Sequence, residues 1–100
     1  MEEQKEVETP PGFKTYILVS YELKNLKPIK KIEVSHKLYG HAQMKNGKRY
    51  EFGGIIKSMK GLKVGKGGLL LPAEFREDIV RFFDGYSIKY LMMQVYRKEA

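Results

Sequence analysis

Aromatic and basic residues are interspersed between Lys37 and Phe52, and these are the residue types that bind nucleic acids. Aromatic rings stack on bases, and lysine and arginine side chains neutralise phosphates. Asn46-Gly47 lies inside this stretch and predicts a two-residue type I′ hairpin turn, because both turn residues must adopt positive φ. This turn fixes the pairing: Lys45 faces Lys48, Gln43 faces Tyr50, His41 faces Phe52 and Tyr39 faces Gly54.

One face of the predicted hairpin is therefore rich in aromatic residues, and the sequence leaves three interpretations of it open. It is a platform on which single-stranded bases stack, a part of the hydrophobic core, or a dimer interface. His41 belongs to this face, whereas His36 has apolar neighbours at alternate positions and is expected to be a packed core residue. The face carries Tyr39, His41, Gln43, Tyr50 and Phe52, with Lys37 extending the row and Lys45 and Lys48 at the tip.

Positive charge is concentrated in the middle of the chain. The 100 residues contain 19 Lys and Arg against 12 Asp and Glu, a formal net charge of +7. By segment, the net charge is −3 over residues 1–13, +10 over residues 14–66 and 0 over residues 67–100. A field of this sign attracts polyanions or an acidic protein surface. A lysine-rich solvated face, as is common in thermophiles, would have the same composition.

The segment from Lys60 to Gly68 is rich in glycine and lysine and predicts a basic loop. This loop does not fit the phosphate-binding loop of nucleotide hydrolases, because Gly61 and Gly65 are one residue too close together and Gly67 replaces the hydroxyl residue that would hold magnesium. Its lysines remain candidates for contacts with nucleic-acid phosphates. They are Lys60, Lys63 and Lys66.

A distinctive pattern of residue spacings follows in the segment from Val64 to Arg76. It consists of Val64, Gly67, Leu69, Leu71, Pro72, Glu74, Phe75 and Arg76. On these residues the segment resembles part of AbrB/MazE-type swapped-hairpin DNA-binding domains. The resemblance covers 13 of the 100 residues, and Gly68 stands where that family usually has Arg or Gln. It implies a homodimer of interleaved hairpins whose basic residues near this segment touch DNA.

The elements that position these residues follow from hydrophobic periodicity. Alternation predicts a strand over 13–23, a second strand over 31–44, the returning hairpin strand over 48–52 and a C-terminal strand over 87–97. Gly53-Gly54 suggests a bulge or bend, and residues 69–71 suggest a short buried strand. Pro72 precedes an amphipathic helix over 73–84, with its apolar stripe at Phe75, Ile79, Phe82 and Phe83.

The predicted fold is therefore α+β, with a mostly antiparallel sheet of four to five strands, one amphipathic helix and a C-terminal strand. Residues 1–12 are expected to be a flexible acidic tail, and residues 13–100 a single domain. The apolar runs are too short to cross a bilayer, and the acidic N-terminal residues do not form a secretory signal, so we expect a cytoplasmic protein without a membrane partner.

The residue types argue against a catalytic or metal site. The sequence has no Cys, its carboxylates are scattered, and two His residues five positions apart do not suggest a shared metal ion. Glu33 and Glu51, the carboxylates of the basic half, fall on opposite faces of the predicted hairpin. We therefore expect no metal and no small-molecule cofactor.

These observations predict a small, basic, non-catalytic protein that binds DNA or RNA. The alternatives are a protein-interaction subunit that docks on an acidic partner and a small nucleic-acid-processing enzyme. The expected contacts to phosphate are Lys37, Lys45, Lys48, Arg49, Lys60, Lys63 and Lys66, and those to bases or sugars are Tyr39, His41 and Tyr50.

Overall fold

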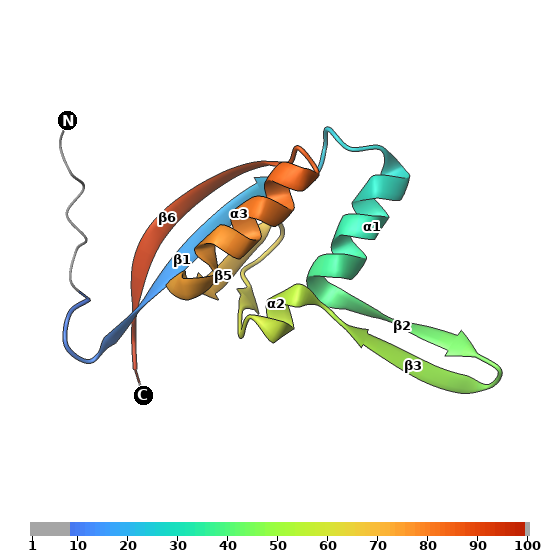
Figure 1. The fold of residues 1–100 in the computed structure, drawn as a ribbon, viewed down its shortest axis with the longest axis horizontal. Helices are drawn as coiled ribbons and strands as arrows, with labels where there is room; N and C mark the ends of the chain where they lie inside the picture. The colour runs from blue at the N-terminus through green and yellow to red at the C-terminus, as the bar shows by residue number, and fades with distance from the viewer. Residues whose placement is uncertain (1–8, 100) are drawn as a thin grey trace.

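The computed structural model describes residues 9–99 and confirms an α+β fold with mostly antiparallel pairing (Figure 1). A four-stranded sheet has the strand order β4-β5-β1-β6, and β2 and β3 form a separate two-stranded sheet. The strands are β1 (Phe13–Glu22), β2 (Gly40–Lys45), β3 (Lys48–Gly53), β4 (Leu62–Lys63), β5 (Gly68–Pro72) and β6 (Lys89–Lys98). The helices are α1 (Pro28–Tyr39), α2 (Ile55–Ser58) and α3 (Arg76–Gly85), with a 3-10 turn at Ala73–Phe75 before α3.

The antiparallel pair of β1 and β6 is the longest strand pair of the four-stranded sheet. The two strands pair over their whole length, from Phe13 with Lys98 to Glu22 with Lys89. Side chains alternate between the two faces of a strand, so one face of the sheet carries the odd-numbered residues of β1. That face is covered by α1, α2 and α3 and forms the core, whose fully buried residues include Val19, Leu69, Leu71, Val34, Leu38, Ile79 and Phe83.

The prediction of a strand over residues 31–44 is wrong in its first part, because residues 28–39 form α1. Pro28 occupies the first turn, where the missing N–H costs no hydrogen bond. Val34 and Leu38 are four residues apart and both fully buried, as on the inner face of a helix, whereas Ile32 is 57% exposed. Gly40 ends the helix with φ of 80°, and the predicted strand begins only there.

The amphipathic helix predicted over 73–84 is confirmed, although its first three residues form the 3-10 turn. Ile79 and Phe83 are fully buried and Phe82 is half-buried, so the apolar stripe does face the sheet. The ring of Phe83 lies between Tyr21 of β1 and Tyr90 of β6, with centroid distances of 5.3 Å and 5.4 Å. This aromatic group holds α3 on the sheet.

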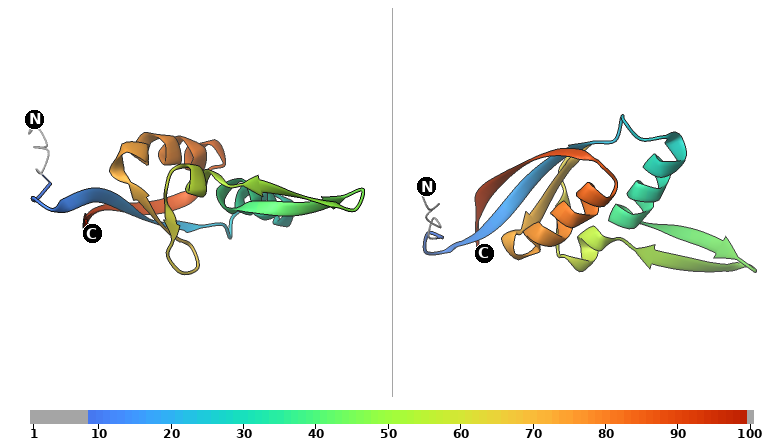
Figure 2. Two further views of the ribbon diagram at one scale, coloured as in Figure 1. Left: turned by 90° about the horizontal axis from the view of Figure 1, so that it is seen from below. Right: turned by 45° about the horizontal axis from the view of Figure 1, so that its top comes forward.

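The hairpin of β2 and β3 projects from the body of the domain, as Figure 1 and the left view of Figure 2 show. Its root is packed backbone against backbone, because a Cβ atom on Gly54 would collide with the carbonyl oxygen of Leu38 and with the amide of Gly40. Gly54 immediately precedes α2, so the predicted bend at Gly53-Gly54 is the junction between the hairpin and this helix. None of the helices in residues 9–99 is long and apolar enough to cross a membrane.

Candidate nucleic-acid interface

The register predicted for the hairpin is confirmed along β2 and β3. His41 pairs with Phe52, Gln43 with Tyr50 and Lys45 with Lys48. Asn46 and Gly47 have φ of 54° and 74°, as a type I′ turn requires. Every residue from His41 to Gly53 is exposed, so the aromatic face is not covered by the core. The interpretation of these hairpin aromatics as core residues is therefore wrong.

A row of stacked rings begins on α1 and continues onto the hairpin. The rings of His36 and His41 lie 4.3 Å apart with an interplanar angle of 18°, and those of His41 and Phe52 lie 4.9 Å apart at 20°. Tyr50 comes next on the same face of β3, and Phe52 and Tyr50 are 48% and 46% exposed. Rings that are already parallel and still half accessible can accept a further planar ring, such as a base.

His36 was expected to be a core residue, and this expectation is wrong because it rested on the strand assignment. On a helix, His36 lies two positions from each of the buried residues Val34 and Leu38, and it faces outward. The four-residue spacing of Val34 and Leu38 fits a helix that leaves His36 on its outer side, but it fits the inner face of a strand equally well. The sequence therefore did not reveal His36 as the member of the aromatic row that links α1 to the hairpin.

Basic side chains surround the tip of the hairpin. Lys45, Lys48 and Arg49 are all exposed, and Lys45 and Lys48 face each other across the turn. Arg49 lies on the opposite face and forms an ion pair with Glu51, with 3.3 Å between Nη2 and Oε1. A solvent-exposed pair of this kind is weak, so Arg49 can exchange its partner for a phosphate.

The aromatic row borders an open groove between the hairpin root and α3, with a volume of about 580 Å³. Its basic side chains are Lys37 and Arg81, and its ring-bearing side chains include Phe82 and Tyr86 in addition to the row. The groove thus combines ring surface with positive charge, which is the combination that single-stranded nucleic acids require.

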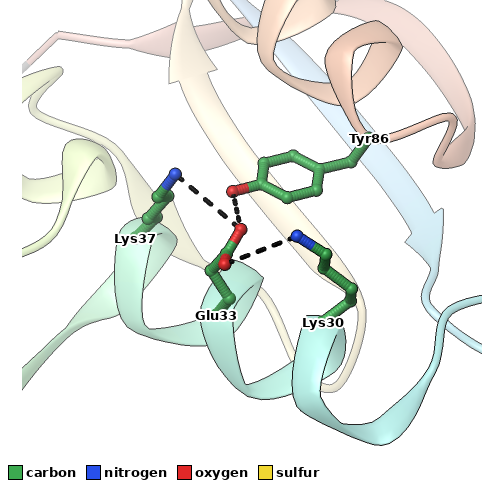
Figure 3. A network of polar contacts seen from close by, with 4 residues as sticks. All are labelled: Lys30, Glu33, Lys37 and Tyr86. Carbon is green, nitrogen blue, oxygen red and sulfur yellow. Dashed lines mark hydrogen bonds and ion pairs between the residues drawn. The ribbon is translucent and has the colours of Figure 1, made fainter.

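Lys37 lies on α1 rather than on the hairpin, and it belongs to a polar network around Glu33 (Figure 3). Tyr86 donates its hydroxyl hydrogen to Glu33, and Lys30 and Lys37 place Nζ atoms 3.6 Å and 3.9 Å from the carboxylate. The hydrogen bond from Tyr86 lowers the pKa of Glu33, with smaller contributions from the two lysines. Tyr86, and to a smaller degree Glu33, raise the pKa of Lys37 above its ordinary value.

Tyr39 is the last residue of α1 and does not join the aromatic face of the hairpin, so its expected pairing with Gly54 is wrong. Its hydroxyl hydrogen-bonds to the hydroxyl of Tyr21, and burial together with this bond raises the pKa of Tyr39. Lys63 lies over its ring, with Nζ 4.8 Å from the centroid. Tyr39 thus connects α1 to the sheet, and His41 and Tyr50 remain as the predicted base contacts on the hairpin.

The predicted phosphate contacts Lys60, Lys63 and Lys66 are exposed but belong to a second surface. They lie around β4 and the loop that leads to β5, and Figure 2 shows that this loop and the hairpin project in different directions. The segment that resembles swapped-hairpin DNA-binding domains begins in this loop. It continues through β5, the 3-10 turn and the start of α3, with Leu69, Leu71 and Pro72 buried.

Within residues 9–99 no group of three His, Asp or Glu side chains could hold a metal ion. Comparisons with protein families, with curated proteins and with solved structures found no match for this chain.

Proposed function

We propose that this protein binds nucleic acid without catalysing a reaction, and that the β2-β3 hairpin is the main contact. The observation that carries the proposal is the exposed row of stacked rings from His36 to Phe52, continued by Tyr50 and flanked by basic residues at the tip. In a single strand the bases are free to stack on such rings, while lysines neutralise the phosphates between them. The sequence alone suggested DNA or RNA, and this row favours single strands of either.

A duplex is the less favourable ligand for this surface. A two-stranded ribbon does fit the major groove, but there it reads base edges through polar side chains. The aromatic face offers rings and one amide, Gln43, between His41 and Lys45. The resemblance to swapped-hairpin DNA-binding domains, with the homodimer that it implies, stays a separate prediction about the segment from Val64 to Arg76.

The experiment is a binding panel of single- and double-stranded DNA and RNA oligonucleotides, measured by fluorescence anisotropy at two salt concentrations. We expect tightest binding to single strands, and affinity that falls as salt rises because counterions are released. Lys45→Glu combined with Lys48→Glu should weaken binding and flatten its salt dependence. The matched control is Lys14→Glu with Lys24→Glu, which changes the net charge equally at two exposed positions outside the hairpin, one in β1 and one in the loop that follows it.

Equal loss of affinity in both double variants would show that net charge alone controls binding, and would contradict the proposal. No binding to any oligonucleotide, together with salt-insensitive binding to an acidic protein, would favour a protein-interaction subunit instead. Metal-dependent cleavage of the oligonucleotides would contradict the absence of catalysis.

A further inference from the structure

Among the described residues, nothing pairs with the outer edge of β6. The strand order of the sheet ends at β6, and within residues 9–99 no strand lies beside it other than β1. Glu99 donates its N–H to the carbonyl of Gly12 at 2.9 Å, and the register continues without a break from Phe13 to Glu22. Because antiparallel pairs alternate, the odd-numbered residues of β6 direct their amides to β1. The even-numbered residues direct theirs outward.

This edge lacks the features that keep edge strands apart. Natural edges carry a central lysine, a proline or a bulge, or are very short. The ten residues of β6 include an uncharged run from Leu91 to Tyr96 without Pro or Gly. Two of these residues, Leu91 and Met93, are 77% and 60% exposed. A long apolar edge of this kind pairs with another strand or aggregates.

We propose that the edge pairs with β6 of a second copy of this chain, antiparallel and centred on Gln94. In this register, each residue whose amide and carbonyl point away from β1 lies opposite another such residue. All of the unpaired amides and carbonyls on both edges therefore find partners. The side chains are complementary as well. Gln94 faces Gln94 of the second copy, Met92 faces Tyr96, Tyr90 faces Lys98, and Lys89 faces Glu99.

Three of these cross-strand pairs, those other than Gln94 with Gln94, bring together side chains that attract each other. A thioether packs well against an aromatic ring, an ammonium is attracted to a ring face, and opposite charges attract across a ladder. Shifting the centre by one residue step, to lie between Met93 and Gln94, would place Lys89 against Lys98 and would pair outward-facing with inward-facing residues. Centring on Met92 or on Tyr96 keeps the hydrogen bonds but leaves Glu99 without Lys89.

The contact would extend the four-stranded sheet into the sheet of the second copy and leave both β2-β3 hairpins free, because these lie in a different sheet. The proposal does not depend on the function of the hairpin. Were the hairpins to bind one strand together, the pairing would raise their combined affinity through effective concentration.

Single cysteines test the register, because the chain has no Cys of its own. Gln94→Cys would face its own symmetry mate at a Cα–Cα distance of about 5.5 Å, which lies within disulfide range. We expect it to form a disulfide-linked dimer on mild oxidation. The control is Arg97→Cys, whose symmetry mate would lie roughly 20 Å away at ~3.4 Å per residue, and it should stay unlinked. Equal linkage of both variants, or none of Gln94→Cys, would overturn the proposal.

Sedimentation of the wild-type chain and of charge variants tests the contact itself. Gln94→Lys puts two like charges at the centre of the interface, and it should raise the dimer dissociation constant by at least roughly tenfold, about 1.4 kcal/mol, with an unchanged circular dichroism spectrum. The control is Leu62→Lys, at an exposed position in β4 on the opposite edge of the sheet, which should leave the dimer intact. A wild-type chain that is monomeric at all concentrations, or a dimer that only Leu62→Lys dissociates, would overturn the proposal.

Discussion

The rings of His36 and His41 stack with their centroids 4.3 Å apart, although one belongs to α1 and the other to the hairpin. This contact links the helix to the hairpin, and the ring of Phe52 on β3 continues the stack. The first prediction concerns the next ring of that face. Tyr50→Ala should lower the affinity for single strands by about tenfold, because loss of base–aromatic stacking costs roughly 1–3 kcal/mol.

Thermal unfolding provides the control for Tyr50, because its exposed side chain contributes little to the core. The melting temperature should barely change, and Tyr50→Phe should bind like the wild type since stacking needs only the ring. If Tyr50→Ala binds normally, the hairpin aromatics are not the base-contacting surface.

The root of the hairpin should tolerate no side chain. Gly54→Ala should destabilise the protein by roughly 1–3 kcal/mol, because its Cβ atom would meet the backbone of Leu38 and Gly40 and the crowded junction would have to shift. Chemical denaturation followed by circular dichroism measures the effect. Gly53→Ala is the matched control, since nothing lies within 4 Å of a Cβ atom there, and equal stability of the two variants would contradict the close packing.

The two adjacent phenylalanines of α3 should differ in their contribution to stability. Phe83 is fully buried against Tyr21 and Tyr90, so Phe83→Ala should cost roughly 3–5 kcal/mol and unfold much of a small domain. Phe82 is half-buried and borders the groove, so Phe82→Ala should cost less. Urea titration of both variants decides, and a stable Phe83→Ala protein would refute the core assignment.

The network around Glu33 predicts a pH dependence of stability. A carboxyl group whose pKa is lower in the folded than in the unfolded protein stabilises the fold above the unfolded pKa, and this stabilisation is lost as the pH falls through the folded pKa. Because the pKa of Glu33 is lowered from 4.5, the free energy of unfolding should decrease as the pH falls below about 4.5. Glu33→Gln should show a shallower decrease.

Tyr86→Phe tests the cause of the lowered pKa of Glu33, because it removes the hydrogen bond that contributes most to it. The pKa should rise toward its ordinary value, as followed by the carboxyl carbon shift in NMR. Identical pH profiles of the wild type and Glu33→Gln, with no change of this pKa in Tyr86→Phe, would contradict the network.

The lysines of the second basic surface should also contribute to nucleic-acid binding. Lys63→Glu combined with Lys66→Glu should weaken nucleic-acid binding and reduce its salt dependence, while the melting temperature barely moves, because both side chains are exposed. A folded double variant with unchanged affinity in the anisotropy assay would restrict the interface to the hairpin and its groove.

How much the sequence predicted depended on whether the deciding interactions are local. The hairpin turn was predictable because Asn46-Gly47 alone determines its geometry, and α3 because its stripe has a helical period. The helix over residues 28–39 was not predictable, because Ile32, Val34 and Leu38 fit both a strand and a helix. Only packing of Val34 and Leu38 against the sheet selects the helix.

The candidate site was likewise predictable only where local interactions determine it. That His41 and Tyr50 share one face of the hairpin was predictable from its register, whereas the exposure of that face followed only from the three-dimensional arrangement. The groove combines α1, the hairpin root and α3, which are far apart in the sequence, so no spacing could have indicated Tyr86 or Arg81.

The pairing of β1 with β6 has a consequence for the order in which the domain folds. It joins Phe13 to Lys98, so the longest ladder of the sheet must wait until nearly the whole described chain is available. The hairpin closes over two residues and can form within about 1–10 μs. Closing the β1-β6 ladder requires a far longer loop, and contacts between distant residues slow folding. The hairpin should therefore form early, while β1 keeps one side open until the last strand arrives.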